Sequence, residues 1–274
     1  MHSWEHAVLW LRAQPEQAEL VRACFYDDPL LSAAERYYQS TEWAAVRELL
    51  PARPGRALDI GSGRGISAYA LSLGGWSVVA LEPDPSPVVG AEAIRALARD
   101  ARLDIEVVQE WGERLPFADA SFDLVHCRQA LHHARDLTRL CREIGRVLRP
   151  GACFVALREH VISRSRDLRA FQDAHPLHHL YGGERAYQLR EYEGAIEAAG
   201  MRLKAVLNPM QSDVNLYPQT LPQIKRQIAQ RLHLPIARFL PDAALRLLGN
   251  LLSTPGRLYS FVAERNPSTP ATHG

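Results

Sequence analysis

Two short strings place histidines and an acid directly after β-prone runs. The string RQALHH at 128–133 follows the run at 122–126, and REH at 158–160 follows the run at 152–157. An imidazole, with an unperturbed pKa of about 6.5, is well suited to take a proton near neutral pH. If the two runs are neighbouring parallel strands, their carboxyl ends meet, and His133 or His132 can act as a general base that Glu159 orients. A hydrogen-bonded structural role, or a role in capping a cofactor, is the alternative for these histidines.

A second histidine-rich segment, HPLHHLYGG, occupies residues 175–183. His175 and His179 are four residues apart, which puts them on one face of a helix and would suit two metal ligands. No cysteine pair and no HExxH pattern accompanies them, so the sequence predicts no metal site. Ordinary polar packing and contact with a substrate both remain open for this segment.

A glycine-rich string, ALDIGSGRG at 57–65, ends one predicted strand and begins a helix. Glycines at such a turn let the backbone approach a ligand at the carboxyl edge of a sheet. The spacing is Gly-x-Gly-x-Gly, and Ile66 stands where a dinucleotide-binding fold would have its third glycine, which disfavours NAD. Glu82 follows the next predicted strand, where a carboxylate can accept hydrogen bonds from both hydroxyls of a ribose. An exposed loop charge is the plainer interpretation of Glu82 taken alone.

The elements that would position these residues alternate between strand and helix. β-prone runs are predicted at 57–60, 77–81, 105–108, 122–126 and 152–157, with helices at 66–73, 88–100 and 136–148 between them. This alternation predicts a parallel sheet with helical crossovers. A helix near 188–199, a strand at 201–207 and a last strand at 257–264 follow.

The composition is that of an ordinary globular protein. Among 274 residues, 32 Lys plus Arg face 31 Asp plus Glu, and 47% of residues are hydrophobic. The net charge of +1 offers no basic footprint for nucleic acid. The four cysteines lack paired CxxC spacing and are predicted to be reduced thiols. The N-terminal segment has no basic leader, and no apolar run is long enough to span a bilayer, so we expect a cytoplasmic protein.

Several of these motifs together resemble the class I S-adenosylmethionine-dependent methyltransferases. ALDIGSGRG is similar to their first motif, LEPD to their ribose-binding acid, ERLPFADASFDLV to their adenine loop and fourth strand, and LCREIGRVLRPGACFVAL to the helix and strand that follow. The resemblance implies an α/β fold with a Rossmann-like, seven-stranded, mostly parallel sheet and helices on both faces. It also implies S-adenosyl-L-methionine as cofactor and S-adenosyl-L-homocysteine as product.

The resemblance further implies a set of contact residues. Trp111 stands where many relatives carry an Asp that contacts the adenine, so an indole that stacks on the adenine is expected instead; a tryptophan filling the core edge is the alternative. We expect the cofactor to contact Tyr38, Asp59, Gly61, Ser62, Gly63, Gly65, Glu82, Pro83, Trp111, Gly112, Glu113 and Arg128. We expect the acceptor to contact His160, His175, His178, His179 and Tyr181.

The chain is expected to divide into a helical lid at 1–50 and a core at 51–274. Two helical insertions, at about 161–187 after the fifth strand and 208–256 before the last strand, would enclose the acceptor. The second insertion mixes basic residues, Arg238 among them, with apolar ones at helical spacing, so contact with a membrane surface is kept as an alternative to a solvated face.

The resemblance favours O-methylation of a sugar or another hydroxylated small molecule, with His133 as base assisted by His132 or Glu159. C- or N-methylation of another small or lipid-linked acceptor is the alternative within the enzyme class. A sensor or scaffold that binds the cofactor without catalysis is the alternative outside it. The acceptor, the pathway and the oligomeric state are not determined by the sequence.

Overall fold

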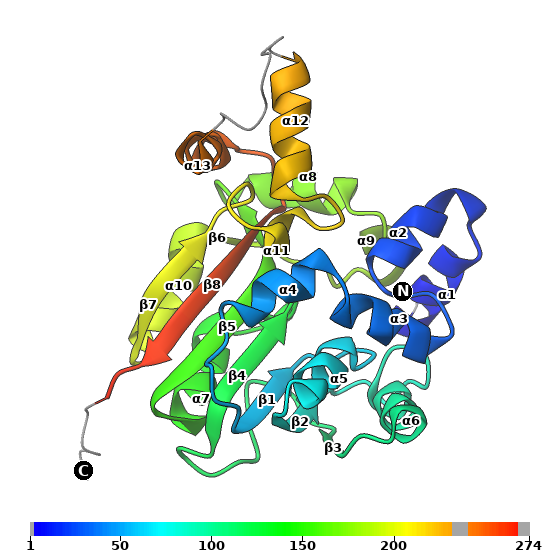
Figure 1. Cartoon of the computed structure of the whole chain (residues 1–274), viewed down its shortest axis with the longest axis vertical. Helices are drawn as coiled ribbons and strands as arrows, with labels where there is room; N and C mark the ends of the chain where they lie inside the picture. The colour runs from blue at the N-terminus through cyan, green and yellow to red at the C-terminus, as the bar shows by residue number, and fades with distance from the viewer. Residues whose placement is uncertain (1–2, 232–240, 268–274) are drawn as a thin grey trace.

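A computed structural model describes residues 3–231 and 241–267. The central sheet has the strand order β3-β2-β1-β4-β5-β8-β7, and a short strand, β6, pairs with the end of β5 (Figure 1). The strands are β1 (Arg56–Ile60), β2 (Ser77–Leu81), β3 (Ile105–Val108), β4 (Phe122–Arg128), β5 (Leu148–Ile162), β6 (Tyr187–Gln188), β7 (Met201–Leu207) and β8 (Arg257–Arg265). The first five strands run parallel, and β8 is antiparallel to both of its neighbours.

This topology confirms the predicted α/β fold with a mostly parallel sheet. The seven predicted strands are all present, but the two-residue β6 was not predicted, because a pair of residues carries no alternating pattern. β5 is also longer than predicted and extends past the string REH.

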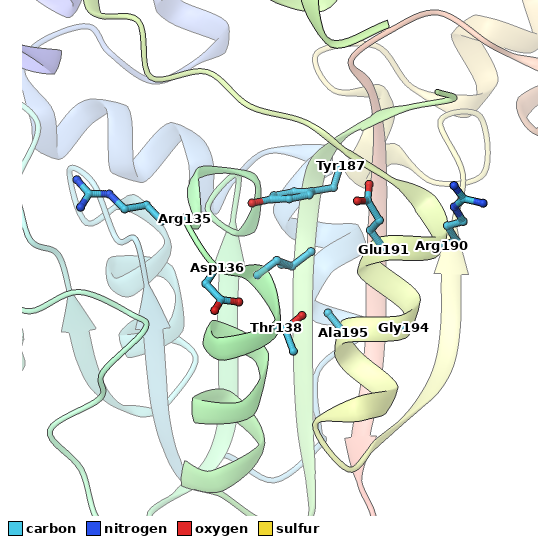
Figure 2. Close-up of a pocket in the computed structure, with 9 residues that line it drawn as sticks. Arg135, Asp136, Thr138, Tyr187, Arg190, Glu191, Gly194 and Ala195 are labelled. Atoms are coloured by element: carbon cyan, nitrogen blue, oxygen red, sulfur yellow. The ribbon is translucent and has the colours of Figure 1, made fainter. Parts of the chain in front are cut away.

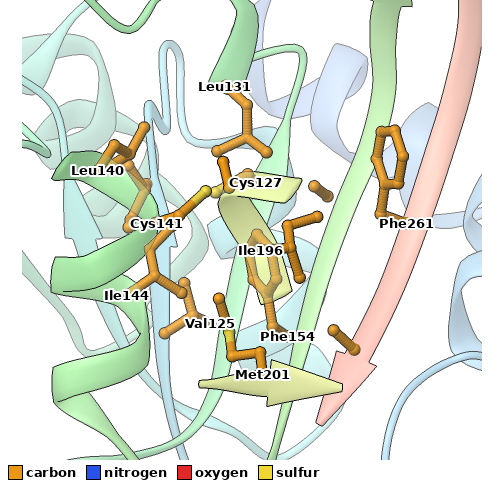
Figure 3. Close-up of a cluster of buried hydrophobic side chains, with 14 of the residues drawn as sticks. Val125, Cys127, Leu131, Leu140, Cys141, Ile144, Phe154, Ile196, Met201 and Phe261 are labelled. Carbon is orange, nitrogen blue, oxygen red and sulfur yellow. The ribbon is translucent and has the colours of Figure 1, made fainter. Parts of the chain in front are cut away.

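Helices cover both faces of the sheet (Figure 1). On one face α7 (Leu137–Val147) and α10 (Leu189–Ala198) pack on β4, β5 and β8, and Figure 3 shows the apolar side chains between them. On the other face lie α3 (Leu30–Tyr38), α4 (Thr41–Arg47), α5 (Ile66–Leu73) and α6 (Ala91–Ala101). Side-chain oxygens begin two of these helices: Ser40 accepts the Trp43 N–H at the start of α4, and Asp136 accepts the Arg139 N–H at the start of α7.

The remaining helices lie in the N-terminal segment and in the two predicted insertions. α1 (Trp4–Arg12), the 3₁₀ turn η1 (Pro15–Gln17) and α2 (Ala18–Ala23) precede α3. α8 (Asp167–Ala174) and α9 (His178–Tyr181) follow β5, and α11 (Asp213–Leu216), α12 (Leu221–Arg231) and α13 (Asp242–Leu251) follow β7. The helical character predicted for all three regions is therefore observed, while Arg238 lies outside the described residues.

All four cysteines lie in the described part of the chain and are free thiols, as predicted. Among the described residues, no helix is both long and apolar enough to cross a membrane.

Candidate functional site

The glycine string forms the turn between β1 and α5. The N–H groups of Gly61 and Ser62 donate to the carbonyl of Leu81, at 2.9 and 3.2 Å, which fixes the turn to the end of β2. Gly61, Gly63 and Gly65 have φ of 66°, 55° and 83°, the left-handed region that glycine enters without a Cβ penalty. A Cβ at Gly63 would meet no heavy atom within 4 Å. The backbone at this turn is therefore open to a ligand.

Glu82, at the end of β2, turns toward the same loop. Its Oε2 accepts the Gly63 N–H at 2.8 Å, and its Oε1 accepts the Asp84 N–H at 3.0 Å. The side chain is buried, and burial raises the pKa of Glu82 to about 7, against the opposing effect of the two backbone N–H donors. Pro83, half-buried, follows it. Glu82 and the open turn at Gly63 thus lie side by side, and contact of either with a cofactor stays a prediction.

Asp59 is buried one strand away, in β1. Its Oδ1 lies 2.7 Å from Nδ1 of His126, its register partner on β4, and its Oδ2 accepts the Ser62 hydroxyl at 2.6 Å. Both Asp59 oxygens therefore have partners within the protein. His126 was not identified from the sequence, because a histidine inside an apolar strand run carries no pattern of its own.

Arg64, in the glycine string, connects the turn to the N-terminal segment. Its Nη1 donates to the carbonyls of Phe25 and Asp27 at 2.8 and 2.9 Å, and its Nη2 pairs with Asp28. Arg64 is 6% exposed, so its contacts with the two carbonyls are largely withdrawn from water, while the side chain of Asp28 stays exposed. Tyr38, half-buried at the end of α3, packs edge-on against Tyr69 of α5.

The loop after β3 carries Trp111, Gly112 and Glu113. The Trp111 side chain is 56% exposed, which contradicts the alternative of a core tryptophan, and the Arg135 guanidinium lies 5.2 Å from its ring centroid. Gly112 has no room for a side chain, since a Cβ there would lie 2.7 Å from Leu140 of α7. Glu113 accepts the Arg135 N–H at 2.9 Å. An exposed indole face at this edge is compatible with stacking on a planar ring.

Arg128, the last residue of β4, forms a two-pronged ion pair with Glu42 of α4. Its Nε and Nη2 lie 2.6 and 2.9 Å from the two carboxylate oxygens, and Glu42 is fully buried. Burial alone would raise the pKa of Glu42, but Arg128 and Arg158 hold it below its ordinary value. The charge of Arg128, which was predicted to face the cofactor, is thus directed to Glu42 of α4.

Glu159 reaches the histidine string because β5 changes its register there. The pairing of β5 with β8 shifts between Ala156 and Glu159, and Arg158 has φ of 59°. Such an irregularity re-aims the side chain that follows it. The Glu159 carboxylate, fully buried, accepts the N–H groups of Ala130, Leu131 and His132 at 3.0 to 3.2 Å.

These contacts anchor the 3₁₀ turn η2 (Leu131–His133) after β4. Oε2 of Glu159 also lies 2.7 Å from Nδ1 of His132, so the predicted pairing of histidine and acid is present. Burial lowers the pKa of His132 well below 6.5, with the nearby His160 and His175 adding to the effect. His132 itself is 1% exposed, which leaves little room for a substrate at its ring.

His133 differs from His132 in being exposed. Its ring lies 4.2 Å from that of His132, and a hydrogen bond joins it to the backbone of Gly183 in the insertion. Desolvation by the surrounding protein, together with the like charge of His132, lowers the pKa of His133 to about 3. The neighbouring Ala130 lies directly against the glycine turn, since a Cβ at Gly61 would come within 2.7 Å of the Ala130 Cβ. The exposed imidazole therefore stands a few residues from the open cofactor turn.

Four of the five predicted acceptor residues are half-buried, and His179 is exposed. His160 donates its Nδ1–H to the carbonyl of Gly256 at 2.9 Å, and burial lowers its pKa. His175 lies beside it, with ring centroids 5.8 Å apart, and burial lowers its pKa to about 4. Tyr181 donates its hydroxyl hydrogen bond to Glu184. His179 is exposed and lies against the carbonyl of Asp173 instead.

His178 and Glu184 each carry a buried polar atom without a hydrogen-bond partner, Nδ1 and Oε2 respectively. Glu184 was not identified from the sequence, because a lone acid in a polar loop gives no signal. Burial raises the pKa of Glu184 to about 7.

A groove of about 540 Å³ lies between the start of α7 and α10, apart from the residues described above (Figure 2). The Tyr187 ring extends across it, and its hydroxyl donates to the carbonyl of Ala134 at 2.7 Å. None of the predicted cofactor or acceptor residues lines this groove.

Comparison with known proteins identifies the core. A family model described as a methyltransferase domain matches residues 58–156. An uncharacterized methyltransferase of Mycobacterium sp. (strain JLS) is 37% identical over 114 residues, which cover 41% of this chain and 42% of that protein. The 27-O-demethylrifamycin SV methyltransferase of Amycolatopsis mediterranei (strain S699) is 35% identical over 130 residues, 46% of each chain.

Among solved structures, the geranyl diphosphate C-methyltransferase of Streptomyces coelicolor A3(2), in complex with Mg²⁺, geranyl-S-thiolodiphosphate and S-adenosyl-L-homocysteine, has a similar fold. The TM-score is 0.59 at 16% identity, over 82% of this chain and 74% of that one. The chain thus carries a methyltransferase domain at residues 58–156. It spans about two fifths of the length of the first curated relatives that it matches.

The cofactor of this family is S-adenosyl-L-methionine, and the described residues fit it. The turn at Gly63 leaves open space where a Cβ would project, and the Glu82 carboxylate lies at the same turn. The exposed Trp111 indole stands at the following strand end. A ribose and an adenine ring thus each have a chemically suitable neighbour along this edge, Glu82 and Trp111.

Proposed function

We propose that this chain transfers the methyl group of S-adenosyl-L-methionine to a hydroxyl group of a small molecule, and that His133 accepts the hydroxyl proton. The bound sulfonium supplies the methyl group, the acceptor oxygen forms the new bond as the carbon–sulfur bond breaks, and S-adenosyl-L-homocysteine leaves. Glu82 would bind the ribose hydroxyls, and Trp111 would lie against the adenine.

One observation carries the assignment of the base. His133 is the exposed imidazole of the pair and follows Ala130, whose Cβ faces the glycine turn, while His132 is buried and paired with Glu159. The lowered pKa leaves His133 neutral at physiological pH, with one unprotonated nitrogen to accept a proton, but it also makes that nitrogen a weaker base than an ordinary imidazole. His132 and Glu159 are positioning residues, because they hold η2 without reaching a substrate themselves.

The relatives support a small-molecule acceptor. The 27-O-demethylrifamycin SV methyltransferase is named for an O-methylation, and the geranyl diphosphate C-methyltransferase for a C-methylation. A sugar or another polyhydroxylated compound is the acceptor that a histidine base serves best, because a hydroxyl is a weak nucleophile until it loses its proton. The 161–187 and 208–256 insertions would shape the acceptor site.

The test combines cofactor binding with turnover. General-base catalysis typically contributes about 10²- to 10⁴-fold, so His133→Ala should lower kcat by that order while the Kd for S-adenosyl-L-methionine stays unchanged. Calorimetry gives the Kd, and mass spectrometry of glycosylated and phenolic acceptors detects the gain of one methyl group.

His6→Ala, which changes an exposed histidine of α1, is the matched control. Equal loss of binding and turnover in His133→Ala would assign His133 to the cofactor. If the product were methylated on carbon or nitrogen and His133→Ala kept full activity, C- or N-methylation would replace O-methylation as the proposed reaction. Tight cofactor binding without turnover on any acceptor class would favour a sensor.

A further inference from the structure

We propose that His132, His160 and Glu184 form a binding site for a divalent transition-metal ion of the zinc type. Each residue offers one ligand atom, and these atoms all lie within 4.8 Å of one another. The side chains come from three separate segments: η2, the end of β5, and the loop that follows α9 within the 161–187 insertion. Metal binding at this place does not depend on the methyl-transfer activity.

The separations suit a small ion. Zinc ligands at about 2.0 to 2.2 Å in a tetrahedral arrangement lie roughly 3.4 Å from one another. Nε2 of His132 lies 3.8 Å from Oε2 of Glu184, which is too long for a hydrogen bond and close to that ligand spacing. Small side-chain rotations would bring all three atoms within reach of one ion.

The two histidines are already oriented as metal ligands are. His160 gives its Nδ1 proton to the carbonyl of Gly256, so Nε2 is the free nitrogen of its neutral ring. His132 is held through Nδ1 by the Glu159 carboxylate, and its Nε2 faces Glu184. A histidine that ligates a metal typically donates its other ring N–H to a carboxylate or a backbone carbonyl, and both arrangements occur here.

The carboxylate supplies an independent observation. Glu184 is 3% exposed, its Oε1 accepts the Tyr181 hydroxyl, and its Oε2 has no hydrogen-bond partner. A buried carboxylate oxygen without a partner is costly, and a cation bound there removes the cost. Two imidazoles and one carboxylate are a common zinc set with three protein ligands, which leaves a fourth position for water or another oxygen.

The sequence prediction of no metal rested on local spacing, and the pair it considered was His175 and His179. His179 turns away to the carbonyl of Asp173, and His175 stands beside the cluster, where its Nδ1 lies 3.6 Å from Glu184. The proposed ion would join η2, β5 and the insertion next to the proposed base, and so would fix the wall of the acceptor site.

The experiment uses the full chain with any affinity tag removed and after treatment with a chelator. Titration with Zn²⁺, followed by calorimetry, and with Co²⁺, followed by visible absorption, should show one equivalent bound, with the Co²⁺ spectrum of a four-coordinate site. Removing a hydrogen-bond partner of a metal ligand typically weakens metal binding by roughly 10- to 100-fold. Glu184→Gln and His160→Ala remove ligands themselves, so each should weaken Zn²⁺ binding by more than that. His179→Ala should bind Zn²⁺ as the wild type does.

The proposal would be overturned if the wild type showed no saturable binding of Zn²⁺ and Co²⁺. It would also be overturned if Glu184→Gln or His160→Ala, shown by circular dichroism to be folded, bound the metal as tightly as the wild type. Elemental analysis of the protein as purified gives an independent stoichiometry. Because no cofactor is added in these measurements, metal binding and methyl transfer can succeed or fail separately.

Discussion

The Glu42–Arg128 pair gives the sharpest test of how the N-terminal helices are held on the sheet. Glu42→Gln keeps the shape of the side chain but removes its charge, and leaves the guanidinium of Arg128 without a carboxylate. The Glu42 side chain is fully buried and that of Arg128 is 11% exposed, so little water can replace the lost partner. Arg158, 4.0 Å from the same carboxylate, also loses its counter-charge.

Removal of one member of a buried ion pair typically costs about 3 to 5 kcal/mol. In domains of about 150 to 250 residues, each kcal/mol of lost stability lowers Tm by roughly 2 to 4 °C, and this chain is only slightly longer. The expected fall in Tm is therefore about 6 to 20 °C. Because the folded-state pKa of Glu42 is lowered, its contribution is present above the unfolded pKa of about 4.3 and is lost as the pH falls. The difference between wild type and variant should therefore shrink in acid.

Urea unfolding at pH 7.5 and pH 4, followed by circular dichroism, measures this difference. Glu92→Ala is the matched control, because Glu92 pairs with Arg95 at the surface, where an ion pair contributes roughly 0.2 to 1 kcal/mol. If Glu42→Gln lowered the free energy of unfolding no more than Glu92→Ala at pH 7.5, the inference that this buried ion pair holds the N-terminal helices on the sheet would be wrong.

Three further predictions concern the cofactor edge. Gly61→Ala should lower the free energy of unfolding by at least about 1 to 2 kcal/mol, because alanine would have to adopt φ of 66° and its Cβ would clash with the Ala130 Cβ. An unchanged midpoint of urea unfolding would contradict this prediction. Arg64→Met should make the segment around Asp27 cleave faster in limited proteolysis, because its carbonyl contacts are lost, and equal cleavage rates would refute the role. Since the pKa of Glu82 is raised to about 7, cofactor affinity should rise roughly tenfold from pH 6 to pH 8 as the carboxylate ionises, and calorimetry of Glu82→Gln should show a flat profile.

The parallel sheet could be predicted from the sequence because its strands are buried runs with clear ends. The helix at 66–73 and the strands at 77–81, 105–108 and 201–207 were predicted to the residue. In each, an apolar run meets a glycine or a polar break, which fixes the boundary. The strand β6 gave no such signal, since it consists of two half-buried residues in a loop.

The site was predictable where motif and topology coincide. Adjacent strand ends bring Glu159 to His132, and the glycine turn to Glu82. Contacts between distant segments were not predictable: Glu42 reaches Arg128, and Glu184 reaches His132, through tertiary packing alone. For the same reason the sequence could not tell which of His132 and His133 is exposed. The two residues are of the same type, and only the packing around them makes His132 buried and His133 exposed.

The four hydrogen bonds that converge on Glu159 have a consequence for the entropy of substrate binding. The backbone of η2 loses its conformational freedom when the chain folds, because a buried carboxylate already holds three successive N–H groups and one imidazole. In the proposed reaction, an incoming acceptor would therefore meet a turn that is already ordered, with His133 at its end, and would not have to order this loop. The binding free energy of the acceptor is then available for its own orientation toward the donor carbon.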